Sequence, residues 1–392
     1  MNWAERVSPT VRSLPPSGIR RFFDIVAEMK GVVSLGVGEP DFITPWHIRE
    51  SSIHGLHKGY TAYTSNFGLL ELREEIARLV YNEADITYDP RREILITVGV
   101  SEGLDLAMRA LLCPGDEVLV PEPCYVSYKA CVTLAGGVPI PVPTSAANEF
   151  RVTVEQLAKL VTPCTKALLI GYPNNPTGAV MPKAELEKIA RFAEQNDLVV
   201  IADEIYAKLT YEGEHTCFAS LPGMRDRTIL LNGFSKAYAM TGWRIGYALS
   251  NPDLIAAMTK IHQYTILCAP VMAQIAAIEA LKKGEADVVK MVSEYNARRR
   301  FMLEGFRQIG LPCFEPKGAF YLFPSIAHTG IDSLRFAEEL LKAEKVALVP
   351  GNAFGESGEG FVRCSYATSI AQLSEALERI GRFVRKLDCK RF

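Results

Sequence analysis

Short apolar runs alternate with helical patterns over residues 92–250, and this alternation constrains the fold more than any other feature of the chain. The segments expected to form strands are residues 93–98, 117–121, 140–143, 166–173, 198–203, 228–234 and 244–250. Helical spacing is found between several of them, at residues 101–112, 124–136, 154–161 and 183–196. Apolar runs without polar alternation are typical of parallel strands that helices cover on both faces. We therefore predict a doubly covered α/β domain whose ligand lies beyond the carboxyl ends of its strands.

The remainder of the chain has a different order of elements. Helices are expected over residues 20–30, 67–84, 288–310, 333–344 and 371–387, and short strands over residues 318–324, 346–350 and 360–366. This mixed order predicts a smaller α+β domain formed by residues 1–43 with 286–392, beside a large domain of residues 44–285. The most apolar long window, residues 261–281, is interrupted by polar residues and Pro270. We expect it to be a buried helix and not a membrane span.

Charge and cysteine content narrow the functional classes. The 43 basic and 45 acidic residues leave a formal net charge of -2, which argues against electrostatic binding to nucleic acid or to an anionic membrane. Nine cysteines are scattered without CxxC spacing, so neither a disulfide scaffold nor a structural zinc site is expected. The charged, proline-containing N-terminus does not match a signal peptide. These features suggest a cytoplasmic protein that acts on small molecules.

The segment TVGVSEGLDLA is a candidate anion site. A strand ends near Val98, and Gly99, Val100 and Ser101 lead into a helix. Free amides at a helix N-terminus bind anions, and a glycine lets a phosphate approach closely. The alternative is that Ser101 with Glu102 is an ordinary helix cap.

Asp203 closes the apolar run LVVIAD at the end of an expected strand. A carboxylate at a buried position needs a partner, since an unpaired buried ion costs several kcal/mol. A structural ion pair is one possibility, and a protonated pyridine nitrogen of a ligand is the other. Tyr206, three residues further on, could direct its phenol toward the same ligand.

Three other residues are candidates for ligand contacts. Asn175, in GYPNNPTG, could donate to a ring oxygen, although the segment is also a good turn sequence. Tyr125 follows an expected strand and could either stack on a flat ring or belong to the core. Arg363 lies inside the apolar run FVRCSY, where it needs an anion such as a carboxylate.

Lys236 stands in NGFSKAYAMTGWRIGY, with Arg244 eight residues later and Gly242 and Gly246 nearby. Most lysines are solvated surface residues, which is the simpler interpretation. A lysine with a depressed pKa can instead form a Schiff base with an aldehyde cofactor. Other templates fail, because the chain has no GxxxxGK[ST], HExxH or GxSxG motif, and GVGEPDF lacks the third glycine of a dinucleotide fingerprint.

Ordered motifs run along essentially the whole chain: SLGVGEPDF, YTSNFGLLELR, YPNNPTG, ADEIY, NGFSKAYAMTGWRIGY and GEGFVRCSYA. Together they resemble the class I/II, fold type I aminotransferases that depend on pyridoxal 5′-phosphate (PLP), in the gamma-type aspartate/aromatic branch. The resemblance implies a three-layer α/β/α, aspartate aminotransferase-like large domain with a mostly parallel sheet, plus a smaller α+β domain.

The resemblance also implies roles for individual residues. Lys236 matches the Schiff-base lysine that acts as a general base, and Asp203 the partner of the pyridine nitrogen. The other implied cofactor contacts are ring-hydroxyl ligands Asn175 and Tyr206, the stacking residue Tyr125, and phosphate ligands Val100, Ser101, Ser235 and Arg244. Gly38 and Arg363, with Asn175, match the substrate-binding residues. Tyr63 matches a tyrosine that reaches the phosphate of the neighbouring subunit, which implies a homodimer.

The expected activity is transfer of the amino group of an aromatic amino acid, or of a broad range of L-amino acids, to a 2-oxo acid such as 2-oxoglutarate. Relatives that use acidic substrates often carry a lysine near the place of Ser101, and this chain has no lysine between Arg92 and Lys129. Arg20 is a candidate for a distal carboxylate, although a surface role is simpler. An aspartate or N-acetyl-diaminopimelate aminotransferase and a carbon–sulfur β-lyase of the same fold stay open as alternatives. A regulatory protein with such a domain is less favoured, since no segment is expected to bind DNA.

Overall fold

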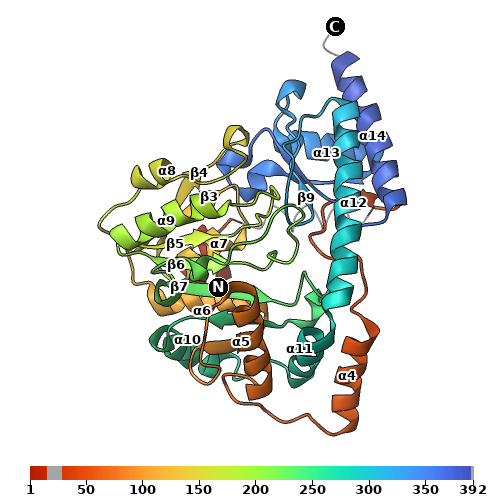
Figure 1. The fold of residues 1–392 in the computed structure, drawn as a ribbon. Coiled ribbons are helices and arrows are strands. Elements are labelled where there is room, and N and C mark those ends of the chain that lie inside the picture. Colours follow the sequence, from red (N-terminus) through yellow and green to blue (C-terminus); the bar gives the residue numbers. More distant parts are fainter. Residues whose placement is uncertain (16–28, 390–392) are drawn as a thin grey trace.

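A seven-stranded sheet in the order β2-β8-β7-β6-β5-β3-β4 forms the centre of the computed structural model, which describes residues 1–15 and 29–389 (Figure 1). Its strands are β2 (Ile94–Thr97), β3 (Glu117–Glu122), β4 (Val138–Pro143), β5 (Thr165–Ile170), β6 (Val199–Asp203), β7 (Thr228–Gly233) and β8 (Gly246–Leu249). The pairs from β4 to β7 are parallel, and β8 is antiparallel to both of its neighbours. The prediction of a mostly parallel sheet is confirmed.

Helices cover both faces of this sheet. They are α5 (Leu70–Ala84), α8 (Val154–Ala158) and α9 (Lys183–Gln195) on one face, and α6 (Gly99–Leu111), α7 (Ser127–Leu134) and α10 (Pro252–Thr265) on the other. Successive strand residues alternate between the two cores, so that Val200 packs in the first and Ile201 in the second. A strand with both faces buried must be apolar at every position. This is why the strand sequences lack polar alternation.

The apolar window of residues 261–281 is divided between two helices. Helix α10 ends at Thr265, and α11 (Val271–Lys283) begins after Pro270. Between them Leu267 has a φ of 74°, and its carbonyl accepts a hydrogen bond from the Asn66 side chain at 2.7 Å. The prediction of one helix here is wrong, because Pro270 has no N–H to continue the helix and disfavours a helical residue before it. Among the described helices, none has the length and apolarity needed to cross a bilayer.

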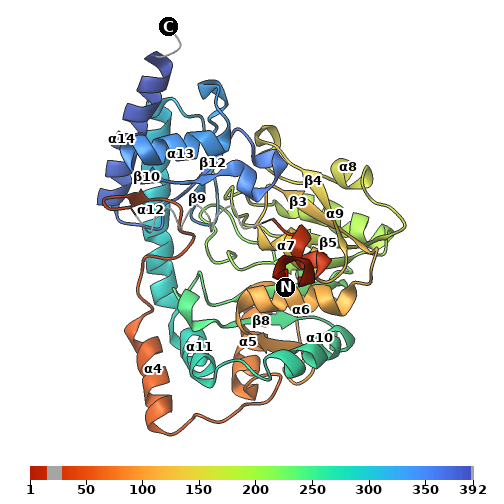
Figure 2. The same cartoon turned by 180° about the vertical axis from the view of Figure 1, so that it is seen from behind.

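The C-terminal part contains two small sheets and three long helices. The helices are α12 (Glu285–Ile309), α13 (Ser333–Glu344) and α14 (Ile370–Cys389), and Figures 1 and 2 show α12 lying along α14. One sheet has the order β11 (Val349–Pro350), β12 (Val362–Ser365) and β9 (Tyr321–Leu322), and the other pairs β1 (Val33–Ser34) with β10 (Val346–Ala347). The strand expected over residues 346–350 is thus two strands with different partners.

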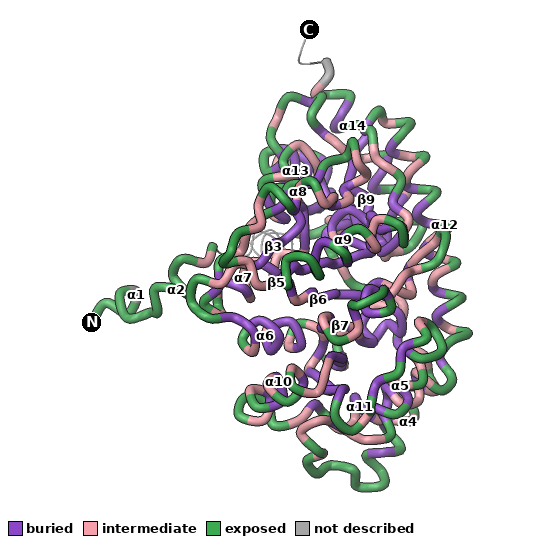
Figure 3. Tube along the Cα trace, turned by 60° about the vertical axis from the view of Figure 1, so that its left-hand side comes forward, coloured by how far each residue is buried: buried purple, intermediate pink, exposed green. Residues whose placement is uncertain are grey.

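The N-terminal segment is placed partly by its pairing with the C-terminal part. Strand β1 pairs in parallel with β10, and Arg379 of α14 donates to the Gly31 carbonyl at 3.2 Å. Helix α4 (Trp46–His57) follows, while α1 (Trp3–Arg6) and α2 (Pro9–Ser13) project from the rest of the chain as exposed helices (Figure 3). Arg20 and most of the helix expected over residues 20–30 lie outside the described residues.

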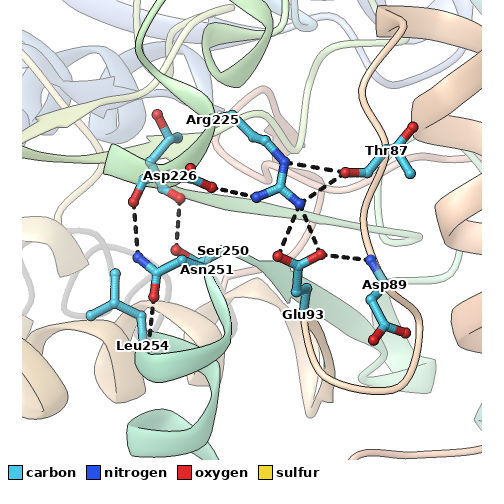
Figure 4. Close-up of polar contacts among 9 residues, drawn as sticks. Thr87, Asp89, Glu93, Arg225, Asp226, Ser250, Asn251 and Leu254 are labelled. Atoms are coloured by element: carbon cyan, nitrogen blue, oxygen red, sulfur yellow. Dashed lines mark hydrogen bonds and ion pairs between the residues drawn. The ribbon is translucent and has the colours of Figure 1, made fainter.

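A polar network lies at the end of the large sheet where strands β2 and β7 begin (Figure 4). Arg225 donates to both carboxylate oxygens of Glu93, at 2.9 and 2.8 Å, and to the Thr87 carbonyl at 2.9 Å. On the same side, the Asn251 side chain donates to the Asp226 carbonyl at 2.8 Å. Because β2 and β7 run in the same direction, the network lies at the amino ends of both strands, opposite their carboxyl ends. It stabilises the scaffold without occupying the end where a ligand is expected.

Candidate active site

A cavity of about 330 Å³ lies at the carboxyl ends of the strands and brings together residues that are far apart in the chain. Every site residue expected from the sequence lines it except Tyr63: Gly38, Val100, Ser101, Tyr125, Asn175, Asp203, Tyr206, Ser235, Lys236, Arg244 and Arg363. The wall also includes residues that the sequence analysis did not select, namely Leu104, Tyr128, Pro173, Ile205, Thr241 and Tyr321. The predicted ligand location beyond the carboxyl ends of the strands therefore coincides with this cavity.

Lys236 follows β7 and is partly buried. Its Nζ atom donates to the Gly38 carbonyl at 2.7 Å and lies 5.8 Å from the ring centroids of Tyr206 and Phe320. Burial lowers the pKa of Lys236 to about 8, with Glu39 opposing and Arg363 reinforcing the shift. Unlike a solvated surface lysine, this residue has a sizeable neutral fraction near neutral pH, as a nucleophilic amine requires.

Asp203 ends β6 and is buried in the floor of the cavity. Its Oδ2 atom accepts a hydrogen bond from the Tyr128 hydroxyl at 2.8 Å, and its Oδ1 from the Ile205 amide at 3.2 Å. Among the described residues it has no ion pair, contrary to the structural alternative considered above. Burial raises the pKa of Asp203 to about 6, and the hydrogen bond from Tyr128 opposes this rise. A cationic ligand atom would supply the partner that the carboxylate lacks.

The anion cradle is formed where β2 leads into α6. The helix begins at Gly99, earlier than expected, and its N-cap is Val98, so Ser101 does not cap it. Gly99 has a φ of +76°, and a Cβ at this position would lie 2.6 Å from Nη2 of Arg244. A Cβ on Gly246 would lie 2.8 Å from the Val100 nitrogen, whereas Gly242 has open space. Two of these glycines therefore let the helix N-terminus and Arg244 approach one point, which suits an anion.

Arg363 is buried in β12 and has no acidic partner among the described residues. Its Nη1 donates to Asn175 Oδ1 at 2.9 Å and its Nη2 to the Gly36 carbonyl at 2.6 Å, while Nε is buried without a partner. An unpartnered donor on a buried guanidinium is suited to a carboxylate ligand. Asn175, expected to contact a ring oxygen, is here the residue that orients Arg363.

Aromatic side chains form much of the cavity wall. Tyr125 is partly buried, with its ring edge-on to that of Tyr128 at a centroid distance of 5.7 Å. The hydroxyls of Tyr206 and Tyr321 lie 2.7 Å apart. One weak signal pointed to Tyr128, namely its position three residues after Tyr125, and no signal singled out Tyr321 among the aromatic residues of GAFYLFP.

Tyr63 lies outside the cavity and is 82% exposed. The neighbouring Thr64 accepts a hydrogen bond from Gln274 at 3.0 Å, and Asn66 bonds to the Leu267 carbonyl. The described chain therefore holds the Tyr63 segment in place but leaves its phenol unburied. Within the part of the chain that the structure describes, Tyr63 does not line the cavity.

The cavity offers three kinds of group in one place: a lysine amine of lowered pKa, a buried carboxylate without a cation, and a helix N-terminus with an arginine. An aldehyde is complementary to the amine, a protonated pyridine nitrogen to the carboxylate, and a phosphate to the helix N-terminus with the arginine. The residues present therefore fit PLP.

Comparison with known proteins identifies the family. Residues 30–380 match the model of aminotransferase class I and II. This chain belongs to the class I and II aminotransferases. A Bacillus subtilis protein named as an aminotransferase, YugH, is 56% identical over 380 residues, spanning 97% of this chain and 98% of the relative. An aspartate aminotransferase of Pyrococcus abyssi is 47% identical over 95% of this chain and 96% of its own length.

Solved structures agree with this placement. The aromatic aminotransferase of Pyrococcus horikoshii is 46% identical and superposes with a TM-score of 0.90 over 94% of this aminotransferase and 100% of that chain. The fold type I resemblance and the α/β PLP-transferase fold are thus confirmed, and the protein is a PLP-dependent transaminase. Relatives named as aspartate aminotransferases and relatives named as aromatic aminotransferases are about equally similar to this chain, so membership of the family does not identify the substrate.

Proposed function

We propose that this aminotransferase binds PLP as a Schiff base on Lys236 and moves the amino group of aromatic, or a broad range of, L-amino acids to a 2-oxo acid such as 2-oxoglutarate. The observation that carries the proposal is the convergence on one cavity of the Lys236 amine, the buried Asp203 carboxylate and the unpartnered Nε of Arg363. Each of these groups lacks a full set of partners within the described chain. PLP and an amino acid would complete all three.

The proposed contacts follow from this arrangement. Asp203 would hold the proton on the pyridine nitrogen of PLP, and PLP bound in this way would supply an electron sink for removal of the substrate α-proton. Lys236, as a free amine in the cavity, would move that proton as a general base. Tyr206 and Asn175 bind the ring hydroxyl, and Tyr125 stacks on the ring. The amides of Val100 and Ser101, with Ser235 and Arg244, bind the phosphate.

The substrate α-carboxylate is assigned to Arg363 and Gly38. A carboxylate that binds Nε and one Nη of Arg363 makes a bidentate contact, the strongest geometry for this pair. Among the described residues lining the cavity the cations are Lys236, Arg244 and Arg363, and each already has a role in this scheme. Within this described lining there is no fourth cation for a distal carboxylate, while Ile205 and Tyr321 offer apolar surface. This favours aromatic substrates over acidic ones.

We further propose a cytoplasmic homodimer in which Tyr63 of each subunit reaches the phosphate of the other site. Its support is the exposure of large apolar side chains: Tyr63 is 82% exposed, Tyr264 is 86% exposed, and Trp3 of the projecting N-terminal helices is 72% exposed. Exposed large apolar side chains are candidates for burial in a subunit interface. The division into a large domain of residues 44–285 and a small domain of residues 1–43 with 286–392 also stands as a proposal.

An amino-donor panel tests the proposed reaction. Purified protein is incubated with PLP, 2-oxoglutarate and either phenylalanine, tyrosine or aspartate, and glutamate is measured. We expect glutamate with the aromatic donors and less with aspartate. A parallel incubation replaces these donors with a cysteine S-conjugate. Release of pyruvate and ammonia from that conjugate, with no glutamate from any donor, would instead establish a β-lyase.

A lysine variant tests the cofactor assignment. Lys236→Ala should lose the visible absorbance of lysine-bound PLP and at least about 10²-fold in rate, with an unchanged circular dichroism spectrum. Lys188→Ala is the matched control, because Lys188 is exposed on α9, where it bonds to Glu185 and does not line the cavity. An unchanged visible spectrum in Lys236→Ala would overturn the assignment.

A further inference from the structure

Tyr321 joins two residues that the proposed reaction uses separately. It lies in β9, is buried, and its hydroxyl oxygen is 2.7 Å from that of Tyr206. The guanidinium carbon of Arg363 lies 4.5 Å from the centroid of its ring. One side chain from the C-terminal part of the fold therefore contacts both the phenol at the end of β6 and the arginine of β12.

The surroundings leave room for this phenol only because of a glycine. A Cβ at position 38 would lie 2.5 Å from the Tyr321 hydroxyl oxygen. Gly38 is also the residue whose carbonyl accepts the hydrogen bond from Lys236. The Tyr321 hydroxyl thus lies in the cavity wall, next to the backbone that holds the lysine.

The direction of the hydrogen bond between the two phenols follows from their roles. Burial raises the pKa of both Tyr206 and Tyr321, so each carries its proton near neutral pH. If Tyr206 donates its proton to the ring hydroxyl oxygen of PLP, its oxygen can only accept from Tyr321. A phenol that accepts a hydrogen bond becomes a better donor, because hydrogen bonds in a chain polarise one another.

We propose that Tyr321 is a positioning residue with two separable functions: its hydroxyl donates to Tyr206 and strengthens the contact of Tyr206 with the cofactor, and its ring orients Arg363 for the substrate carboxylate. The inference rests on the proposed function, since it assumes that PLP occupies this cavity. The ring function uses the attraction between a guanidinium and an aromatic face, which phenylalanine would retain.

The hydroxyl function has a spectroscopic consequence. A weaker donor at Tyr206 leaves more negative charge on the ring oxygen, and this charge retains the proton on the Lys236 nitrogen. Removing the Tyr321 hydroxyl should therefore raise the pH midpoint at which the visible spectrum of the PLP-loaded protein changes. We expect a rise of about half a pH unit, the order of one neutral hydrogen bond acting through another.

The experiment compares Tyr321→Phe, Tyr321→Leu, Tyr206→Phe and the Tyr206→Phe/Tyr321→Phe double variant as PLP-loaded proteins. Tyr321→Phe should raise the midpoint and leave KM for the amino donor within about twofold. Tyr321→Leu should raise the midpoint equally and also raise KM roughly tenfold, because the contact with Arg363 is lost. The double variant should have the midpoint of Tyr206→Phe, since coupled residues are not additive.

Each contrary outcome is distinct. An unchanged midpoint in Tyr321→Phe, or a further shift in the double variant, would overturn the hydroxyl function. Equal KM values for the leucine and phenylalanine variants would overturn the ring function, and Tyr321→Met replaces the leucine variant if the latter does not fold. Failure of the unsubstituted protein to bind PLP would instead refute the proposed function.

Discussion

The Nζ atom of Lys236 donates a hydrogen bond to the carbonyl of Gly38 across 2.7 Å. The two residues belong to distant parts of the chain, since Lys236 follows β7 of the large sheet and Gly38 follows β1, which pairs with β10. The amine is thus held by backbone and not by a carboxylate. It can leave this contact without leaving an unpaired charge behind.

The reactivity of Lys236 should follow a midpoint near pH 8. Burial lowers the pKa of this amine from 10.5 to about 8, and only the neutral amine attacks an aldehyde. The rate at which cofactor-free protein combines with PLP should therefore rise through about pH 8, where it reaches half of its maximum, and level off at about pH 9 to 10. Stopped-flow absorbance over pH 6 to about 10 measures this rate. A rate still rising steeply at the upper end would contradict the buried position of the amine.

Stability of the cofactor-free protein should respond to the same group. The pKa of Lys236 is lower in the folded protein than in the unfolded chain. Between about pH 8 and 10.5 the lysine is therefore protonated more in the unfolded chain than in the folded protein. The contribution of Lys236 to the free energy of unfolding consequently rises with pH through this window. Lys236→Met removes that contribution. The difference in urea midpoint between the variant and the unsubstituted protein should shrink as the pH rises. A difference independent of pH would argue against the shift.

Replacement of Arg363 should affect the substrate more than the cofactor. Arg363→Ala removes charge-assisted hydrogen bonds to the α-carboxylate, and KM for the amino donor should rise roughly 10- to 100-fold. The dissociation constant of PLP, measured by fluorescence titration, should change little. Arg335→Ala is the control, since Arg335 bonds to Glu339 on the exposed side of α13. Loss of PLP with a normal KM would mean that Arg363 has been misassigned.

Tyr128 should support PLP binding through Asp203. Its hydroxyl donates a hydrogen bond to Asp203 at 2.8 Å. Burial raises the pKa of Asp203 to about 6, and this hydrogen bond opposes the rise. Without that hydrogen bond the pKa of Asp203 should rise further, so that less carboxylate is available for the pyridine nitrogen. Tyr128→Phe should weaken PLP binding about tenfold at pH 7. When the solution is acidified, the PLP affinity of this variant should begin to fall at a higher pH than that of the unsubstituted protein. Tyr125→Phe, which keeps the stacking ring, should have a smaller effect; equal losses in both variants would contradict this role.

Alanine substitution at two glycines with positive φ distinguishes an effect of backbone conformation from an effect on ligand binding. Gly99 and Gly115 have φ values of +76° and +94°, but a Cβ would lie 2.6 Å from Arg244 at position 99 and meet nothing within 4 Å at position 115. Each alanine substitution should lower the free energy of unfolding by roughly 1–2 kcal/mol. Only Gly99→Ala should also weaken the binding of PLP and of inorganic phosphate. Calorimetric titration with both ligands makes the comparison, and equal affinities in the two variants would remove Arg244 from the anion cradle.

The strands and most helices were predictable because their signal is local. Apolar runs and helical spacing do not depend on which partner is present, and the helix expected over residues 333–344 has the bounds of α13. The break after Thr265 was harder to predict, since a proline in an apolar window can kink a helix or end it. The two strands within residues 346–350 differ only in their partners, Val33–Ser34 and Val362–Arg363. Pairing is a long-range property that a local pattern does not contain.

The candidate site was predictable where a residue type was unusual for its position, as with Asp203 and Arg363 at the ends or inside apolar runs. Tyr128 and Tyr321 are ordinary aromatic residues in apolar segments. Tyr321 faces the cavity because β9 pairs with β12 in the register that sets Tyr321 opposite Ser365, and no feature of GAFYLFP specifies this register.

The pairing of β1 with β10 has a consequence for biosynthesis. A chain emerging from the ribosome contains Val33 and Ser34 long before Val346 and Ala347, so β1 waits for its partner until most of the protein has been translated. Contacts between such distant segments form late, because a long loop must close first. The Gly36 and Gly38 carbonyls, which hold Arg363 and Lys236, reach their places only then. The large sheet can therefore assemble during synthesis, whereas the substrate side of the cavity is completed after it.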